Sequence, residues 1–204
     1  MKVPLLPYLV LILMGAAWGL SIPLTKITVS TGYGQFGLIF WQFVLADILL
    51  GSVSIARRKR PLFERKTLFL FTVLALVGTI FPNSASYVAT YYLPASFIAI
   101  LIATVPMFSF PIAMVMGLEK VDFRRISGIV IGFLGVFVLT APEASFPDRH
   151  LIIFIPLALL APFFYAIEGN FVDKYGTAGQ DPIQTFTGAS ILGTFLILPV
   201  TIST

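Results

Sequence analysis

The sequence contains no cysteine, a single histidine and few charged residues, which make up 11% of its 204 positions. Without cysteine, the chain can form neither a disulfide framework nor a thiolate site. His150 directly follows Asp148 and Arg149, and we interpret it as a solvated loop residue rather than a metal ligand. The sequence has no His-Glu-x-x-His, Walker A or Gly-x-Ser-x-Gly motif. These absences predict a protein that is not an enzyme and that uses no metal or organic cofactor.

Long apolar runs are abundant instead, since 58% of the residues are hydrophobic. The uncharged run from Ala95 to Leu118 would reach about 36 Å as one helix, which exceeds the ~30 Å hydrocarbon core of a bilayer. We therefore predict an all-α polytopic membrane protein, a helix bundle in contact with lipid. Its seven expected transmembrane helices cover residues 4–28, 35–56, 67–91, 95–118, 126–141 and 151–172 and a stretch that begins near 183.

The thirteen Lys and Arg residues are distributed unevenly between the loops. If the N-terminus lies inside, eleven of them fall in inner segments and two, Lys26 and Arg149, in outer ones. Because cytoplasmic loops of membrane proteins carry the excess of Lys and Arg, we predict a cytoplasmic N-terminus in a plasma (inner) membrane. We interpret the basic tract at residues 57–66 as a topology anchor beside anionic lipid rather than a nucleic-acid site.

A weak internal repeat relates the first and sixth predicted helices. Residues 9–28 can be set over residues 156–175, and each segment leads through a glycine-containing loop into another apolar helix. Five helices per unit is an odd number, so a second unit would enter the membrane from the opposite side. Chance similarity between two apolar helices is the alternative explanation. The alignment pairs Trp18 with Tyr165 and Ser21 with Glu168.

Several short motifs, in this order and spacing, resemble the EamA domain of the drug/metabolite transporter superfamily. They are Trp18-Gly19, the corner from Ala89 to Ser96, Pro106, the stretch from Gly117 to Glu119, and the glycine-rich stretch Gly128, Gly132 and Gly135. The resemblance covers essentially the whole chain. It implies a secondary transporter of ten helices, built as two inverted five-helix repeats that alternate access to a central cavity.

On this reading, residues 1–142 form the first repeat and residues 151–204 begin the second. The chain departs from the family pattern in two ways: Gln42 stands where the family often has arginine, and no helices 8 to 10 are present. The first departure leaves the charge of the substrate open. Because helices 8 to 10 are not in this sequence, it does not show half of the cavity, and we expect the chain to be part of a ten-helix protein.

Two acidic residues lie within predicted spans, where charged groups are costly and often functional. Asp47 lies near the middle of the second span, and either it is neutral and hydrogen-bonded to a neighbouring helix or it binds a coupling ion such as a proton. Glu168 lies nearer the inner end of the sixth span. Either it reaches the membrane interface or, with Tyr165 one turn earlier, it faces the substrate path.

Polar and aromatic residues give further candidates for substrate contact. Asn83, Tyr87 and Tyr91 are spaced by four and are expected along one side of a helix, although Tyr91 also fits an interfacial aromatic belt. Trp18 is either a core aromatic or part of the cavity wall. The substrate-binding or coupling candidates are Trp18, Ser21, Gln42, Asp47, Asn83, Tyr87, Tyr165 and Glu168, and the helix-breaking or gating candidates are Pro23, Pro82 and Pro106.

Small residues spaced by four predict close helix packing, mainly within the chain. These pairs are Gly15 with Gly19, Ala85 with Ala89, and Gly128 with Gly132. Whether the protein also forms oligomers through such faces is left open.

Three functions are consistent with these features. The first is a transporter of small organic metabolites or drugs, which works without ATP and by alternating access. The second is a structural or assembly protein of the membrane that moves no solute. The third, an intramembrane enzyme, would need a nucleophile or metal site that this sequence does not show. The expected partners are membrane lipid, a small-molecule substrate and a coupling ion such as a proton.

Overall fold

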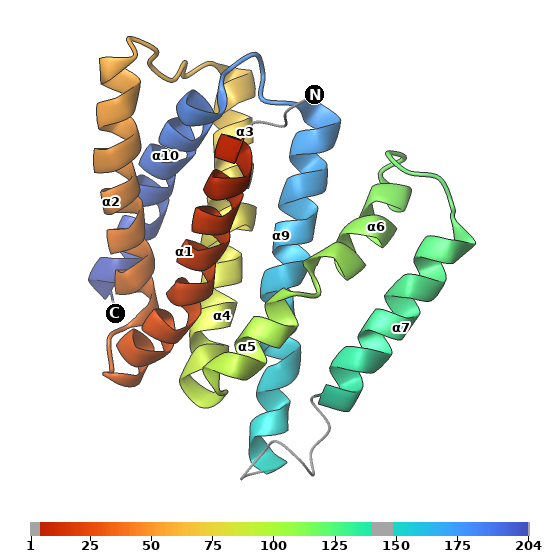
Figure 1. Ribbon diagram of the computed structural model, residues 1–204. Coiled ribbons are helices and arrows are strands. Elements are labelled where there is room, and N and C mark those ends of the chain that lie inside the picture. Colours follow the sequence, from red (N-terminus) through yellow and green to blue (C-terminus); the bar gives the residue numbers. More distant parts are fainter. Residues whose placement is uncertain (1–4, 140–148, 204) are drawn as a thin grey trace.

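The computed structural model describes residues 5–139 and 149–203, and its elements there are all helical (Figure 1). Within these ranges, 6 helices are long and apolar enough to cross a membrane. A seventh helix, α7 (Phe123–Leu139), has 17 described residues, while its expected end at Ala141 and the domain boundary at 142 lie outside the described residues. The prediction of an all-helical membrane bundle is confirmed. The six spans are Leu5–Ser30, Gln35–Ala56, Arg65–Tyr92, Ala95–Val115, His150–Tyr175 and Pro182–Ser203.

Successive spans alternate in direction, so the connections gather at two ends of the bundle (Figure 1). The start of α1 (Leu5–Ser30) lies toward the same end as the connections at 57–64, 116–122 and 176–181. We call this the basic end, because most of the lysines and arginines lie in or beside these connections. Helix α9 (Ile155–Tyr175) begins at the other end and therefore runs antiparallel to α1.

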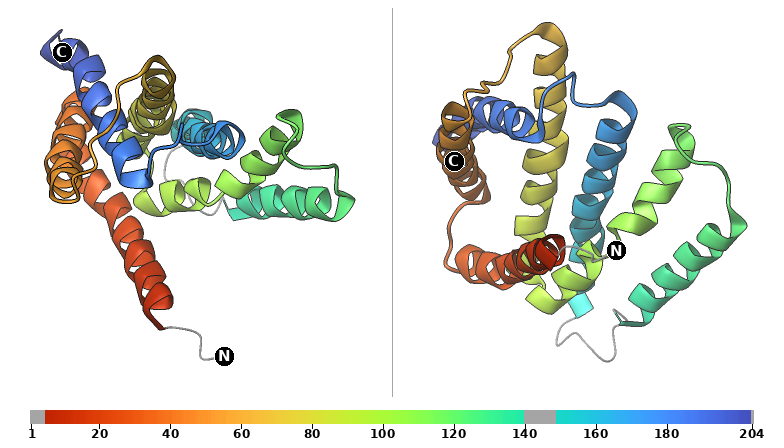
Figure 2. Two further views of the ribbon diagram at one scale, coloured as in Figure 1. Left: turned by 90° about the horizontal axis from the view of Figure 1, so that it is seen from above. Right: turned by 45° about the horizontal axis from the view of Figure 1, so that its top comes forward.

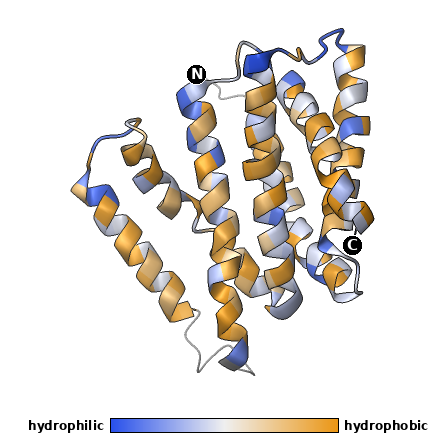
Figure 3. Cartoon of the chain, turned by 180° about the vertical axis from the view of Figure 1, so that it is seen from behind, coloured by the Kyte–Doolittle hydropathy of each residue, from blue (hydrophilic) through white to orange (hydrophobic). Residues whose placement is uncertain are grey.

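Most helical residues are hydrophobic, and strongly hydrophilic residues concentrate near the helix ends and connections (Figure 3). Large side chains such as Leu13, Ile131 and Phe195 are exposed on the outside of the bundle. In water such a surface would be unfavourable, whereas in a bilayer it is the surface that contacts hydrocarbon.

The third span contains one turn of wider helix. It consists of α3 (Arg65–Ala75), the π-helical turn η1 (Leu76–Ile80) and α4 (Phe81–Tyr92). Pro82 has no N–H, and the Phe81 N–H is donated to the Leu76 carbonyl five residues earlier. The predicted helix over 67–91 is therefore present, but η1 changes the direction in which its two parts present their side chains.

The fourth span corrects the prediction of one continuous helix over 95–118. Helix α5 (Ala95–Ile102) ends before Ala103 and Thr104, and α6 (Val105–Val115) begins after them. Pro106 cannot donate to the Ile102 carbonyl, and the N–H and hydroxyl of Thr104 both donate to the Leu101 carbonyl three residues earlier, at 3.1 and 2.6 Å. The uncharged composition predicted the span, but these local hydrogen bonds interrupt it.

Helix α10 (Pro182–Ser203) packs tightly against α2 (Gln35–Ala56) and α3 through two glycines that the spacing rule did not identify. A Cβ on Gly193 would lie 2.4 Å from the Phe43 ring, and one on Gly188 would lie 2.3 Å from the Phe71 ring. Both rings are buried, at 4% and 0% exposure, so they fill the space that the glycines leave. Close approach of α10 therefore depends on these two positions.

The small-residue pairs predicted from spacing have mixed outcomes. Ala85 and Ala89 are buried as expected. A Cβ on Gly132 would meet Met107, but Gly15, Gly19 and Gly128 have no described neighbour within 4 Å of that position. Spacing in the sequence identifies helix faces that carry small residues, but it does not tell which of these faces packs against another helix.

Polar contacts hold the connections of the basic end together. Asp181 lies 3.5 Å from Arg57 and 3.4 Å from Lys59. Gln180 accepts a hydrogen bond from the Leu62 N–H at 3.0 Å. The pKa of Asp181 is lowered from its ordinary value, mainly by the hydrogen bond from the Gln184 backbone N–H and also by Lys59 and Arg57.

Two further charged residues bind close to helix ends. Glu119 pairs with Arg125 at 3.1 Å, beside the start of α7. At the other end of the bundle, Lys26 donates to the carbonyls of Thr90 and Tyr91, both at 2.8 Å. These carbonyls belong to the last turn of α4, where a cation also complements the helix dipole.

Candidate functional site

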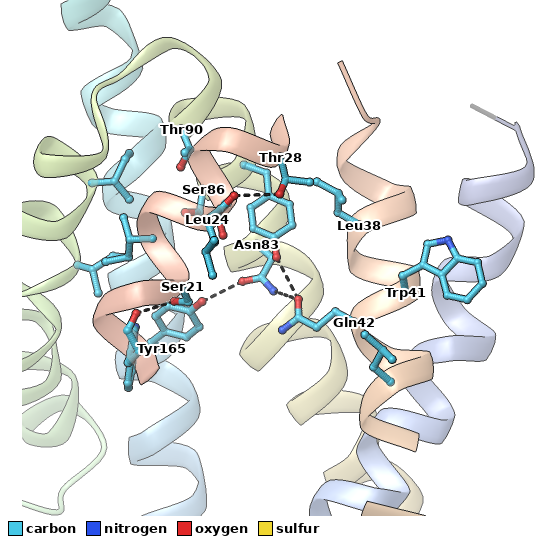
Figure 4. Close-up of a pocket in the computed structure, with 17 residues that line it drawn as sticks. Ser21, Leu24, Thr28, Leu38, Trp41, Gln42, Asn83, Ser86, Thr90 and Tyr165 are labelled. Carbon is cyan, nitrogen blue, oxygen red and sulfur yellow. Dashed lines mark hydrogen bonds between the residues drawn. The ribbon is translucent and has the colours of Figure 1, made fainter. Parts of the chain in front are cut away.

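A cavity of about 680 Å³ lies between α1, α2, α4, α5 and α9 (Figure 4). Its volume is in the range of cavities that hold metabolite-sized ligands. None of the residues that line it carries a formal charge, and several have hydroxyl or amide groups. The lining residues are Trp18, Ser21, Ile22, Leu24, Thr25, Thr28, Leu38, Trp41, Gln42, Leu45, Asn83, Ser86, Tyr87, Thr90, Ile98, Ile102 and Tyr165.

The cavity occupies the half of the bundle that is remote from the basic end. Its residues come from the second half of α1, the first half of α2, α4 and the start of the fourth span. These parts all adjoin the connections at 31–34 and 93–94, which lie opposite the basic connections (Figure 1). Tyr165, near the middle of α9, is the contribution of the sixth span.

A hydrogen-bond network links residues of three helices along one side of the cavity (Figure 4). The Tyr165 hydroxyl donates to Asn83 Oδ1 at 2.9 Å, and Asn83 Nδ2 donates to Gln42 Oε1 at 2.9 Å. The Tyr87 hydroxyl donates to the same Gln42 oxygen at 3.0 Å. We call these four residues the amide network. It joins α2, α4 and α9 through side chains alone.

The amide network leaves donors available to a ligand. Gln42 Oε1 already accepts two hydrogen bonds, whereas the Gln42 Nε2 group donates to no other described residue. An amide nitrogen carries two N–H donors. The Thr90 hydroxyl on the cavity wall is also buried and has no hydrogen-bond partner among the described residues. A ligand with carbonyl or hydroxyl acceptors could satisfy these groups.

The periodicity of α4 decides which of its residues face the cavity. Asn83, Tyr87 and Thr90 line it, whereas Tyr91 is 51% exposed and contacts Tyr92 instead. A step of four residues drifts by about 40° around a helix, and two steps by about 80°, whereas a step of seven drifts by only about 20°. The side of α4 that faces the cavity therefore includes Asn83, Tyr87 and Thr90, and Tyr91 lies outside it.

The cavity brings together six of the eight binding or coupling candidates chosen from the sequence. Two others, Asp47 and Glu168, are not among its lining residues. The six are Trp18, Ser21, Gln42, Asn83, Tyr87 and Tyr165.

Asp47 is held between α2 and α10. The Thr194 hydroxyl contacts Asp47 Oδ2 at 2.7 Å, while Asp47 Oδ1 is buried without a hydrogen-bond partner among the described residues. Asp47 is thus hydrogen-bonded to a neighbouring helix, as one of its two alternatives assumed.

Glu168 lines a second, smaller cavity of about 140 Å³ between α2, α3, η1, α9 and α10. Its carboxyl group lies against the π-helical turn, since a Cβ on Gly78 would be 2.4 Å from the carboxyl carbon. No described ion pair includes Glu168. Gln42 lines both cavities and therefore separates them.

The three candidate prolines have different environments. Pro106 follows the interruption between α5 and α6, and Pro82 follows η1. Pro23 lies inside α1, which continues through it, so helix breaking at Pro23 is not what the structure shows. The flanking turns of α1 provide enough hydrogen bonds to carry the helix past one missing N–H.

The sequence interpretation missed several residues of the cavity wall. Thr25 and Thr28 share one face of α1 with Ser21, at steps of four and three, and this spacing was the available signal. Ser86 is three residues after Asn83, so the same spacing could have identified it, whereas Trp41 directly precedes Gln42 without such a signal. Thr194, which holds Asp47, could not be found without knowing that α10 packs on α2.

The described residues contain no group of three His, Asp or Glu side chains that could hold a metal ion. The chemistry that this site offers is thus hydrogen bonding and aromatic contact around an uncharged space. Such a site can bind and orient a solute.

Comparison with curated proteins identifies distant relatives. An uncharacterized transporter of Archaeoglobus fulgidus is 22% identical over 94% of this chain and 66% of its own length. Two WAT1-related proteins of Arabidopsis thaliana are 24% and 25% identical over 70% and 61% of this chain, and over 39% and 35% of their own lengths. The chain thus covers less than two thirds of each of these relatives. No solved structure matches it.

The family pattern agrees with the fold and the site. Residues 5–141 match the EamA-like transporter family, a match that covers more than half of the chain. The matched residues include the first four spans, helix α7 and every cavity residue except Tyr165. By this match, the chain belongs to the EamA-like transporter family.

Proposed function

We propose that this protein is a secondary transporter that carries a small, uncharged or zwitterionic organic solute through the cavity described above, by alternating access. The observation that carries the proposal is an uncharged cavity at membrane depth, closed on its inner side by the amide network. Polar groups at this depth are costly unless a ligand, water or another side chain satisfies them.

The lining of the cavity defines the class of solute. Trp18, Trp41, Tyr87 and Tyr165 offer ring faces, and the free N–H groups of Gln42 offer hydrogen-bond donors. A solute with a flat or apolar part and carbonyl or hydroxyl acceptors fits both features. A solute with a single net charge would find no counter-ion among the lining residues and would lose its hydration.

The same geometry suggests which state the structure represents. We assign the basic end to the cytoplasm, because Lys and Arg accumulate in cytoplasmic loops. The cavity then opens toward the outer side, and the amide network blocks the path to the inner side. Transport would require this network to separate while the outer helices close.

We also propose that residues 1–142 form one five-helix repeat and that residues 151–204 begin an inverted second one. The antiparallel course of α1 and α9 supports this division (Figure 1). Residue 142 itself lies outside the described residues.

Binding can be measured with the tryptophans of the protein. Both of its tryptophans, Trp18 and Trp41, line the cavity, so a solute that enters should change the intrinsic fluorescence. We would titrate the purified protein with panels of neutral, zwitterionic, anionic and cationic metabolites. We expect saturable changes with neutral or zwitterionic compounds and weaker ones with singly charged compounds.

The Asn83→Leu variant tests whether the amide network contributes. This change removes both hydrogen bonds of Asn83, so the Tyr165 hydroxyl loses its acceptor and Gln42 Oε1 keeps only the Tyr87 donor, and affinity should fall about 10-fold or more. Ser52→Ala, on the exposed side of α2, is the matched control and should bind as the wild type does. If no class of compound changes the fluorescence, or if Asn83→Leu binds normally, the proposal fails, and a structural role in the membrane becomes the better explanation.

A further inference from the structure

We propose that Glu168 is a proton-binding site that is linked to solute binding through Gln42. This inference rests on the proposed transport function, because it assigns the coupling ion and its place. The site lies in the 140 Å³ cavity, which is separate from the solute cavity and shares Gln42 with it. Asp47, the other acid at membrane depth, lines neither cavity.

The backbone beside Glu168 offers an acceptor for a proton. In an α-helix the Gly78 carbonyl would accept from residue 82, but Pro82 has no N–H. The Val77 carbonyl would accept from the Phe81 N–H, which is donated to Leu76 instead. The carboxyl group of Glu168 lies against this turn, as the 2.4 Å approach to a Cβ on Gly78 shows. A protonated carboxyl can donate to such a carbonyl, whereas a carboxylate is only an acceptor.

The surrounding helices offer no cation that would hold Glu168 as a carboxylate. Helices α5, α6 and α10 and the turn η1 contain no titratable side chain. From α4, Tyr87 is the nearest titratable group and is bonded to Gln42, while Tyr91 and Tyr92 lie at the far end. On α9 itself, Tyr165 donates to Asn83.

The remaining charged groups near α9 are engaged elsewhere or lie at the basic end. Asp173, in the last turn of α9, is exposed there. Asp47 of α2 contacts Thr194, and Lys174 at the end of α9 donates to the Met116 carbonyl at 2.7 Å. Arg65 and Lys66 of α3 lie at its first turn, at the basic end. With no cation beside it among these groups, the buried Glu168 carboxylate is neutralised by binding a proton.

A proton is a better fit than a sodium ion. Sodium needs several oxygen ligands, and apart from Glu168 and Gln42 the side-chain oxygens that line this cavity are only those of Thr79 and Ser190. Gln42 Oε1 accepts two hydrogen bonds from the amide network. A proton requires only the carboxyl oxygen and one acceptor.

The position of the site suggests how it communicates with the solute. The cavity residues of α9 and α10 lie in the halves of these helices nearer the basic end, while those of α2 lie around its middle, so protons would arrive from the basic side. Gln42 forms one wall of this cavity and also accepts from Asn83 and Tyr87 on the solute side. A change in the charge of Glu168 would thus act on the residue that holds the amide network closed.

The test compares solute affinity across pH in the wild type and in Glu168→Gln. Using the neutral compound with the largest tryptophan response, we expect the wild-type dissociation constant to change about 10-fold between pH 5.5 and 8.5, a usual strength for coupled sites. Glu168→Gln, which mimics the protonated acid in size and hydrogen bonding, should lose this dependence. Gly78→Ala, whose methyl group would displace the carboxyl group, should lose it as well, and Asp47→Asn should keep it.

A second measurement does not need a solute. Infrared difference spectra between low and high pH should show the C=O band of a protonated carboxyl in the wild type, and this band should be absent in Glu168→Gln. If that band persists in Glu168→Gln, if pH dependence survives there, or if sodium at fixed pH produces the change, the proton site is wrong. If the band is lost as expected while no compound binds, it is the transport proposal that fails and not the proton site.

Discussion

The two acids at membrane depth, Asp47 and Glu168, lie in different environments. Asp47 is bonded to Thr194 at a tight helix interface, whereas Glu168 lines a cavity beside a turn of backbone with carbonyls that lack their α-helical donors. From the sequence, Asp47 was a candidate for binding a coupling ion, and Glu168 was a candidate for facing the substrate path. The difference teaches that depth in the membrane marks a costly residue, while access and partners decide whether it holds helices together or takes part in transport.

The same contrast applies to the glycines beside the two acids. Gly193 precedes Thr194 and is packed against the buried ring of Phe43, while Gly78 is packed against the end of the flexible Glu168 side chain. A ring in a filled interface cannot move, but a carboxyl group beside a cavity can. We therefore expect structural consequences at the first position and functional ones at the second.

The largest expected effect on stability comes from Gly193→Ala. The added methyl group would lie 2.4 Å from the Phe43 ring, so α10 must move away from α2. Overpacking of this kind costs about 1–3 kcal/mol, and we expect a lower melting temperature in detergent-based thermal unfolding. Gly51→Ala, on the partner helix α2 and with no described neighbour within 4 Å, is the control and should unfold no earlier than the wild type. Equal melting temperatures for the two variants would show that α10 is not packed as described.

A smaller effect is expected for Thr194→Val, which keeps the shape of the side chain but removes its hydroxyl. The lost bond to Asp47 should cost about 1 kcal/mol, since hydrogen bonds between membrane helices are modest. Solute affinity and its pH dependence should stay unchanged in fluorescence titrations. A loss of pH dependence in this variant would move the coupling role from Glu168 to Asp47 and reverse the comparison.

The smallest effect is expected for Asp181→Asn, which provides a third carboxylate as a surface reference. Its folded pKa is lowered from 3.8, chiefly by the bond from the Gln184 N–H, so it stabilises the fold above that pH and less as pH falls through the lowered value. Wild type and Asp181→Asn should therefore differ slightly in melting temperature at pH 7 and converge as the pH is lowered well below 3.8. A difference that grows on acidification would contradict this sign.

Much of the fold could be predicted from composition and charge. The apolar runs located six spans, and the motifs from Trp18 to Gly135 identified the family, because hydrophobic length and short motifs are local properties. The interruption at Ala103 and Thr104 and the turn η1 could not be placed, since each depends on which carbonyl accepts which donor. A proline indicates where a helix can be interrupted but not whether it is. Helix α1 continues through Pro23, whereas the fourth span is interrupted just before Pro106.

The candidate site was predicted in part for a similar reason. Polar residues within apolar spans pointed to Gln42, Asn83 and Tyr165, which the fold brings into one network. Which acid lines a cavity depends on the packing of α10 and on the close approach of Gly78 to Glu168, and neither leaves a local pattern. Long-range helix pairing is the information that sequence spacing does not carry.

The central claim, an aqueous solute cavity between α1, α2, α4 and α9, is tested most directly by cysteine labelling. The natural sequence has no cysteine, so Ser21→Cys on the cavity wall and Ile131→Cys on the exposed side of α7 each provide a single thiol at membrane depth. Thiol reagents react with the thiolate, which forms in water and not in lipid. In intact membranes, a small impermeant reagent added from outside should label Ser21→Cys rapidly, more slowly when a bound solute is present, and Ile131→Cys hardly at all. Equal labelling of the two positions would contradict the claim.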